Sequence, residues 1–106
     1  MIAMSDDRKH DSVLEARGRV RDPNGLHLKV ASEISRACAK FSSTRVTITA
    51  GNGRTADARS PLALLTLGAP AEQLLVIAAQ GPDAQAALEA LEPYILLEKA
   101  PAPVIP

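Results

Sequence analysis

The chain has 106 residues, with 12 acidic and 12 basic side chains, so its formal net charge at pH 7 is zero. This balance gives no global attraction to nucleic acid or to an anionic membrane, and we expect neither as a partner. A chain of this length can form one domain with a hydrophobic core of its own. That core must be mostly aliphatic, because Phe41 and Tyr94 are the only aromatic residues.

The N-terminal segment, residues 1–12, mixes acidic and basic side chains with His10 and shows no hydrophobic periodicity. We interpret it as a flexible arm. It lacks the apolar region of a secretory signal peptide, and no apolar run in the chain approaches the length of a membrane span. Cys38 is the only cysteine, which excludes an intramolecular disulfide. These features favour the cytoplasm.

The next part of the chain predicts a strand, a turn and a helix. Side chains from Val13 to Arg21 alternate between small or apolar and charged, which is typical of a strand with one buried face. Asp22-Pro23-Asn24-Gly25 has the composition of a turn. From Leu28 to Phe41 the apolar residues recur at helical spacing. They are Ala31, Ile34, Ala37, Cys38 and Phe41.

A histidine stands where this helix begins. His27 would be the N-cap, and Lys29 follows in the first turn. The first backbone N–H groups of a helix have no intrahelical partner and form the positive end of its dipole. Such a place suits an anion, and a phosphoryl group carried on a ring nitrogen is one. The alternative interpretation of His27 is an exposed N-cap residue without chemistry.

The middle of the chain predicts a hairpin followed by a short helix. Strands over Arg45–Ala50 and Thr55–Arg59 are joined by the hairpin residues Gly51-Asn52-Gly53. The pair Ser60-Pro61 has the composition of an N-cap and a first helical position, and the helix would cover Leu62–Leu67.

The last part of the chain predicts a central strand and a third helix. Gln73–Ala79 is almost continuously apolar, as expected of a strand inside a sheet. Gly81-Pro82-Asp83 opens the helix, and Pro93 should kink or end it near Leu91 or Glu92. Its apolar stripe is Ala84, Ala87, Leu88, Leu91 and Ile95. Residues 99–106 form a Pro-rich tail that we expect to be extended.

The order β-α-β-β-α-β-α indicates an α+β fold, with helices on one face of a sheet whose other face is solvated. Within this order, two motifs resemble the histidine-containing phosphocarrier protein (HPr) family of the bacterial phosphoenolpyruvate-dependent sugar phosphotransferase system. The first is Gly25-Leu26-His27-Leu28-Lys29-Val30, where the family has Gly, an aliphatic residue, His, any residue, Arg and Pro. The second runs from Ser60-Pro61-Leu62 to Thr66-Leu67-Gly68, a serine-opened short helix that ends in an aliphatic residue and Gly.

The resemblance covers residues 13–98, which we take as one HPr-like domain between the two tails. It implies an open-faced β-sandwich, with a four-stranded antiparallel sheet and three helices on one face. It also implies that the protein is a phosphocarrier, which is a stoichiometric component of a phosphoryl relay and not an enzyme. His27 would accept a phosphoryl group from enzyme I, itself charged by phosphoenolpyruvate, and pass it to enzyme IIA-type proteins. The family precedent is Nδ1, in which case Nε2 should point outward or to a weak partner.

The residues around His27 suit this chemistry. An acceptor imidazole must be neutral and must expose a nitrogen lone pair, and a helix N-terminus disfavours the imidazolium. The backbone N–H groups of Lys29 and Val30 would meet the phosphoryl oxygens, and the Lys29 side chain adds a cation. Lysine lacks the planar fork of the family's arginine. Val30, in place of the family's proline, gives the first turn an additional N–H and less rigidity.

A rival interpretation keeps the fold but makes the chain a regulatory protein-binding module, with weak or no role in sugar transport. It would be controlled by a serine kinase acting on Ser60, or by no phosphorylation; the simpler interpretation of Ser60 is an ordinary N-cap. In either case the short helix would supply a docking patch, with Leu62 exposed beside His27 and Leu65 buried.

The remaining features predict little chemistry. Cys38 lies on the apolar stripe of its helix and should be structural. The sequence contains no cluster of metal ligands and no Gly-rich nucleotide loop, so we expect no cofactor. The arginines of the first strand, Arg17, Arg19 and Arg21, should lie on a solvated face or, alternatively, form a basic patch for an acidic partner. We expect a monomer.

Overall fold

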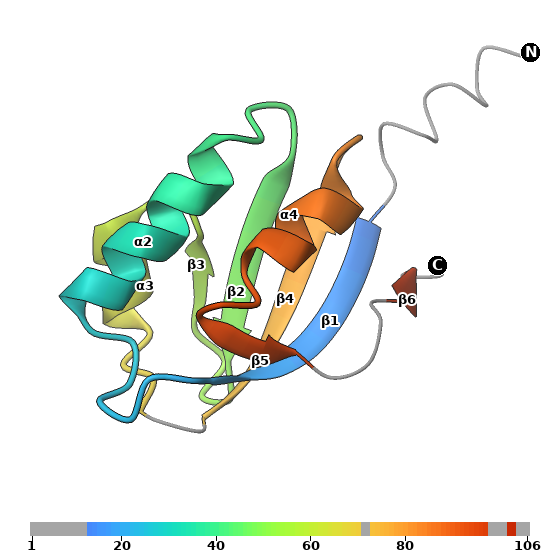
Figure 1. Cartoon of the computed structure of the whole chain (residues 1–106). Coiled ribbons are helices and arrows are strands. Elements are labelled where there is room, and N and C mark those ends of the chain that lie inside the picture. Colours follow the sequence, from blue (N-terminus) through green and yellow to red (C-terminus); the bar gives the residue numbers. More distant parts are fainter. Residues whose placement is uncertain (1–12, 71–72, 98–101, 104–106) are drawn as a thin grey trace, which may run out of the picture.

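An antiparallel sheet forms one layer of the molecule and helices form the other (Figure 1). The computed structural model describes residues 13–70, 73–97 and 102–103. The strands are β1 Val13–Val20, β2 Arg45–Ala50, β3 Thr55–Asp57, β4 Leu74–Gln80, β5 Ile95–Leu97 and β6 Ala102–Pro103. The helices are α2 Leu28–Ala39, α3 Pro61–Thr66 and α4 Ala84–Ala90. The predicted arm, residues 1–12, and the predicted tail, apart from β6, lie outside the described residues.

The strands follow the order β3-β2-β4-β1-β5, and β6 also pairs with β1. The apolar segment β4 is therefore central, as its composition predicts. In its register, Ile77 stands between Ala16 of β1 and Ile48 of β2. All three side chains are buried, so one row across the sheet points into the core.

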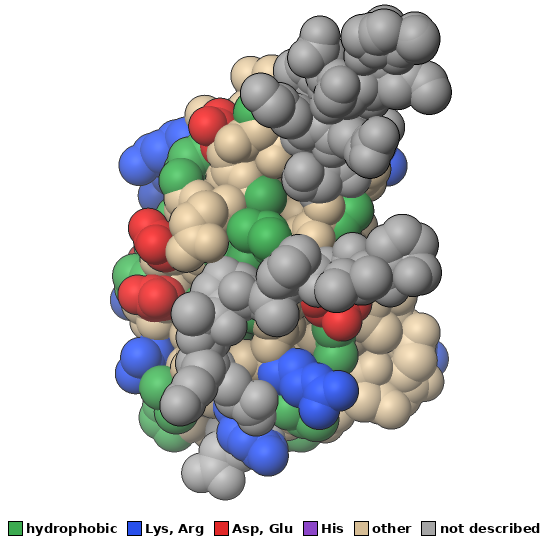
Figure 2. Space-filling view, turned by 90° about the vertical axis from the view of Figure 1, so that its right-hand side faces the viewer, with side chains coloured by type: hydrophobic (Ala, Val, Ile, Leu, Met, Phe, Trp, Pro, Cys, Tyr) green, Lys and Arg blue, Asp and Glu red, His purple; other side chains and the backbone are tan. Residues whose placement is uncertain are grey.

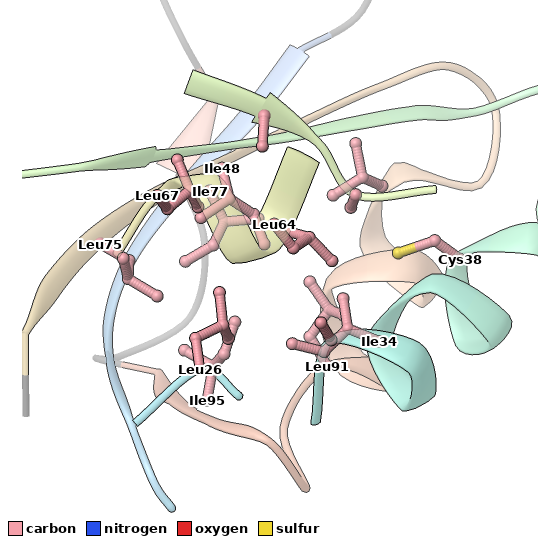
Figure 3. Packing of buried hydrophobic residues seen from close by; sticks show 14 of the residues in the cluster. Leu26, Ile34, Cys38, Ile48, Leu64, Leu67, Leu75, Ile77, Leu91 and Ile95 are labelled. Carbon is pink, nitrogen blue, oxygen red and sulfur yellow. The ribbon is translucent and has the colours of Figure 1, made fainter. Parts of the chain in front are cut away.

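The helices cover one face of the sheet, as expected (Figure 1). Alternation along β1 shows this directly, because Ala16 and Gly18 are buried while Glu15 and Arg17 are exposed. Between the two layers, aliphatic side chains from strands and helices converge (Figure 3). The largest fully buried apolar residues are Ile34, Ile48, Leu64, Leu67, Leu75, Ile77, Leu88, Leu91, Ile95 and Val46. The predicted aliphatic core is confirmed, with Phe41 and Tyr94 only at its margin.

The predicted number of strands is wrong, although the fold class is confirmed. Within the described residues the sheet has six strands, because the chain after Pro93 turns back as β5 and pairs with Gly18–Val20, and β6 pairs with β1 farther along. Ile95 is buried as expected, but it belongs to β5 and not to the last helix. Gly18 allows this close approach, since a Cβ there would lie 2.6 Å from Ile95 Cγ2.

The open face of the sheet mixes charged and apolar side chains. Arg19 stands between Leu74 of β4 and Leu96 of β5, both exposed. Arg21 lies beyond the strand, and its Nε donates to the carbonyl of Glu92 at 2.7 Å. On the side of the molecule where β1 lies, basic, acidic and hydrophobic side chains are interspersed (Figure 2). Both charge signs are therefore present among the described side chains that are visible on this side.

Cys38 is 1% exposed on α2, and burial raises the pKa of its thiol to about 11. Because the thiolate is the reactive form, alkylation of the folded protein at pH 8 should be on the order of a hundredfold slower than for an unperturbed thiol. The rate of iodoacetamide incorporation, followed by intact mass, measures this. The same protein unfolded in urea is the control, and equal rates in the two states would contradict a buried thiol.

Candidate functional site

The loop before α2 is held at both of its ends. Asp22 Oδ1 accepts a hydrogen bond from the Asn24 N–H at 2.8 Å, which closes the turn. Gly25 has a φ of 83°, a left-handed conformation that glycine adopts without a steric cost. The next residue, Leu26, is buried, and its N–H donates to the carbonyl of Ala69 at 2.9 Å. The loop is thereby anchored just before His27.

His27 is the N-cap of α2, as the sequence predicts. Its backbone is extended, its carbonyl accepts from Ala31 N–H at 2.8 Å, and its side chain makes no capping hydrogen bond. The N–H groups of Leu28, Lys29 and Val30 precede this first intrahelical bond. The imidazole is thus free of the helix that it opens, and its side chain is 37% exposed.

Asp22 is the side chain that pairs with His27. Its Oδ2 lies 3.0 Å from His27 Nε2. The hydrogen bond from the Asn24 backbone, and then that from His27, hold the pKa of the Asp22 carboxyl below its usual value of 3.8. Nε2 therefore faces a carboxylate, and the expectation that it points outward or to a weak partner is wrong. Sequence reasoning treated Asp22 only as a turn residue, although the turn itself brings the carboxylate back to the ring.

The two residues that replace the family's Arg and Pro have different environments. Lys29 is exposed in the first turn of α2, where its cation can reach a group bound near His27. Val30 is 5% exposed and belongs to the core. Its side chain is thus committed to packing, which leaves its backbone N–H as the group available at the site.

Ser60 caps α3, as predicted, because its Oγ accepts from the Ala63 N–H at 3.2 Å. Leu62 is 73% exposed, as expected. The prediction that Leu65 is buried is wrong: Leu65 is only partly buried, and Leu64 and Leu67 fill the core in its place. The reason is the phase of a short helix, in which only residues three or four apart share the inner face.

Helices α2 and α3 connect the two motifs in space. Leu26 at the start of α2 is bonded to Ala69, just beyond the end of α3, whereas the carbonyl of Arg59 accepts from Ser35 Oγ in the middle of α2 at 2.6 Å. The start of α3 therefore lies against the middle of α2, and the end of α3 lies near the start of α2. Leu28, which is 60% exposed, is the apolar side chain next to His27 that sequence reasoning missed.

Other kinds of site find little support in the described residues. Among them, no group of three or more His, Cys, Asp or Glu side chains is placed to hold a metal ion. None of their helices is long and apolar enough to cross a membrane.

The chain that places His27 at a helix start also matches a known protein family over most of its length. The family model described as "PTS HPr component phosphorylation site" matches residues 14–96. The chain belongs to the HPr family. HPr proteins are phosphocarriers of the phosphotransferase system, not catalysts, and the resemblance of the two sequence motifs is confirmed.

Individual relatives agree with this HPr assignment. The chain is 36% identical over 91 residues to a multiphosphoryl transfer protein of Escherichia coli O157:H7, covering 85% of this chain but 24% of that protein. It is 35% identical over 77 residues to the phosphocarrier protein HPr of Buchnera aphidicola, covering 73% of this chain and 88% of that one. The crystal structure of HPr from Bacillus anthracis matches with a TM-score of 0.72 and 28% identity, over 78% of this chain and 96% of that chain.

The cap of α3 can be tested by replacement of Ser60. Ser60→Ala should lower the free energy of unfolding by about 1 kcal/mol, because the Ala63 N–H loses its acceptor. Urea unfolding followed by circular dichroism measures the change. Ser60→Asp, which keeps an acceptor at this position, is the matched control and should remain close to the wild type. An unchanged midpoint in Ser60→Ala would show that the cap contributes nothing.

Proposed function

We propose that the chain carries a phosphoryl group on His27, received from enzyme I and passed to enzyme IIA-type proteins of a phosphotransferase system. The observation that carries this proposal is the placement of His27, a partly exposed imidazole at the N-cap of α2 that takes no part in capping. Membership of the HPr family supports the same chemistry. The place of action would be the cytoplasm, and the carrier would act as a monomer without a cofactor.

The residues around His27 would stabilise the phosphorylated form. The N–H groups of Lys29 and Val30, at the positive end of α2, would donate to the phosphoryl oxygens. The exposed cation of Lys29 would compensate their charge. Transfer of a phosphoryl group asks the protein mainly for position and charge stabilisation, and this helix start offers both.

Exposed leucines on α2 and α3 would form the docking surface for protein partners. Leu28 and Leu62 are the large apolar side chains of these two helices that are most exposed, and Leu65, about one turn after Leu62 on α3, is partly buried. An exposed apolar group near an acceptor residue offers contact area to a protein carrying the phosphoryl donor or acceptor. The docking residues would therefore be Leu28, Leu62 and Leu65.

A regulatory module controlled through Ser60 remains the second candidate. A phosphate on Ser60 would sit at the start of α3 and change the charge beside Leu62. The structure gives Ser60 Oγ a complete local role in capping Ala63 N–H, so the candidate rests on its position alone. After modification by a serine kinase, a phosphate oxygen would have to accept from the Ala63 N–H in place of the hydroxyl oxygen.

Intact-mass spectrometry tests the phosphocarrier directly. Incubation with enzyme I and phosphoenolpyruvate, followed by analysis at neutral to alkaline pH, should add one acid-labile phosphoryl group to the wild type and none to His27→Ala. A standard HPr in the same mixture controls for active enzyme I. Absence of the adduct from a folded wild-type chain, with the standard HPr phosphorylated, would move the assignment to the regulatory module or to a different donor.

Replacement of Lys29 tests charge compensation. Lys29→Ala should slow phosphorylation of His27 about tenfold, since a hydrogen bond to a charged group is worth roughly 1.5–3 kcal/mol. Lys29→Arg should speed it, because the guanidinium binds two phosphoryl oxygens at once. The initial rate of adduct formation measures both, with Lys40→Ala, an exposed lysine beyond the far end of α2, as the control for loss of charge. An unchanged rate in Lys29→Ala, or no gain in Lys29→Arg, would contradict charge compensation by Lys29.

A further inference from the structure

We propose that Asp22 is a positioning residue for His27, whose carboxylate keeps the proton of the neutral imidazole on Nε2 and leaves Nδ1 with its lone pair for the phosphoryl group. The role of Nδ1 as acceptor rests on the proposed function. The orientation and the protonation of the ring do not, and they can be measured without any partner protein.

The geometry gives each oxygen of Asp22 a separate partner. Oδ1 accepts from the Asn24 N–H at 2.8 Å, and Oδ2 lies 3.0 Å from His27 Nε2. The first bond fixes the carboxylate in the turn, so that the second can fix the imidazole. Both side chains are partly shielded from solvent, with 30% of Asp22 and 37% of His27 exposed.

The protonation of the pair follows from chemistry. The two hydrogen bonds keep the pKa of Asp22 below its usual value, so the carboxyl is ionised at neutral pH. An ionised carboxylate can only accept, which makes Nε2 the donor. In a neutral imidazole one nitrogen carries the proton and the other the lone pair, so the lone pair is on Nδ1.

No other contact in the described part of the chain opposes this arrangement. The imidazole does not cap α2, and within the described residues Nδ1 makes no hydrogen bond. Asp22 is therefore the side chain that orients the ring. The lone pair of Nδ1 is not consumed by the helix, in contrast to the hydroxyl of Ser60, which caps α3.

The same contact would act during transfer. As Nδ1 attacks, its lone pair becomes the new N–P bond, and the donor's bond to phosphorus breaks with its electron pair leaving on the donor. The proton stays on Nε2, so the ring acquires positive charge. The Asp22 carboxylate faces that charge, as the aspartate of a catalytic triad faces its histidine. Partial exposure makes the effect smaller here than in a buried triad.

The sharpest variant is Asp22→Asn. Its amide oxygen can still accept from the Asn24 N–H, so the turn is retained, but its NH₂ group then faces Nε2 as a donor. The neutral ring should change to the tautomer with the proton on Nδ1, which removes the lone pair from that nitrogen. Asp83→Asn is the matched control, because Asp83 is exposed at the start of α4 and its side chain makes no capping bond.

Long-range ¹H–¹⁵N correlation spectra of the full chain at about pH 8.5, well above the usual imidazole pKa, report the tautomer. Comparison with His27→Asn separates the His27 signals from those of His10. We expect the proton on Nε2 in the wild type and in Asp83→Asn, and on Nδ1 in Asp22→Asn. A wild-type ring with the proton on Nδ1, or an Asp22→Asn ring that keeps it on Nε2, overturns the proposal.

Phosphorylation by phosphoramidate, a small P–N phosphoryl donor, extends the test to reactivity without enzyme I. The rate should fall at least about tenfold in Asp22→Asn, by analogy with a wrong-tautomer triad, and remain unchanged in Asp83→Asn. An unchanged rate in Asp22→Asn overturns the role of Asp22 in transfer. Expected tautomers in a wild type that no donor phosphorylates support the orientation by Asp22, while the proposed function itself fails.

Discussion

The site depends on the burial of one residue, Leu26. Its side chain enters the core from the loop, and its N–H is tied to the carbonyl of Ala69 at the end of α3. With Leu26 fixed in the core, helix α2, which begins two residues later, starts from a defined position. His27 therefore stands at the edge of the core, on a rigid element and still accessible to another protein.

The two helix starts on this side of the fold use their N-cap residues differently. At α3 the side chain of Ser60 is occupied by the Ala63 N–H, which makes the cap a structural element. At α2 the backbone of His27 alone begins the helix, and the side chain is left to a carboxylate of the preceding turn. A helix start whose side chain is not used for capping keeps its first backbone N–H groups and that side chain available together, which is the combination that the proposed phosphocarrier role would use.

The departures from the family motif also differ in kind. Val30 occupies the family's proline position with a side chain packed in the core, and its backbone gives the first turn an N–H that proline lacks. Lys29 retains positive charge at the surface but loses the paired donors of arginine. The first change bears on the rigidity of the helix start, and the second on how firmly phosphoryl oxygens would be held in the proposed phosphohistidine. The Asp22 carboxylate next to His27 is a third local feature, and it contacts the imidazole ring itself.

Hydrophobic periodicity and turn residues were sufficient to predict the α+β class, the three helices, the central position of β4 and the location of His27 at a helix start, because each of these follows from local patterns. They failed where distant segments meet. Strand β5 can pair with β1 only because Gly18 on β1 has no side chain. Leu64 is buried in place of Leu65 because of the way in which α3 lies against the sheet. The contact between Asp22 and His27 depends on the path of the turn, which places a carboxylate beside a ring that residue spacing alone leaves unpartnered. The sequence by itself determined which residues could carry chemistry, whereas the tertiary structure decided which of them face one another, since side-chain direction is set by packing between elements.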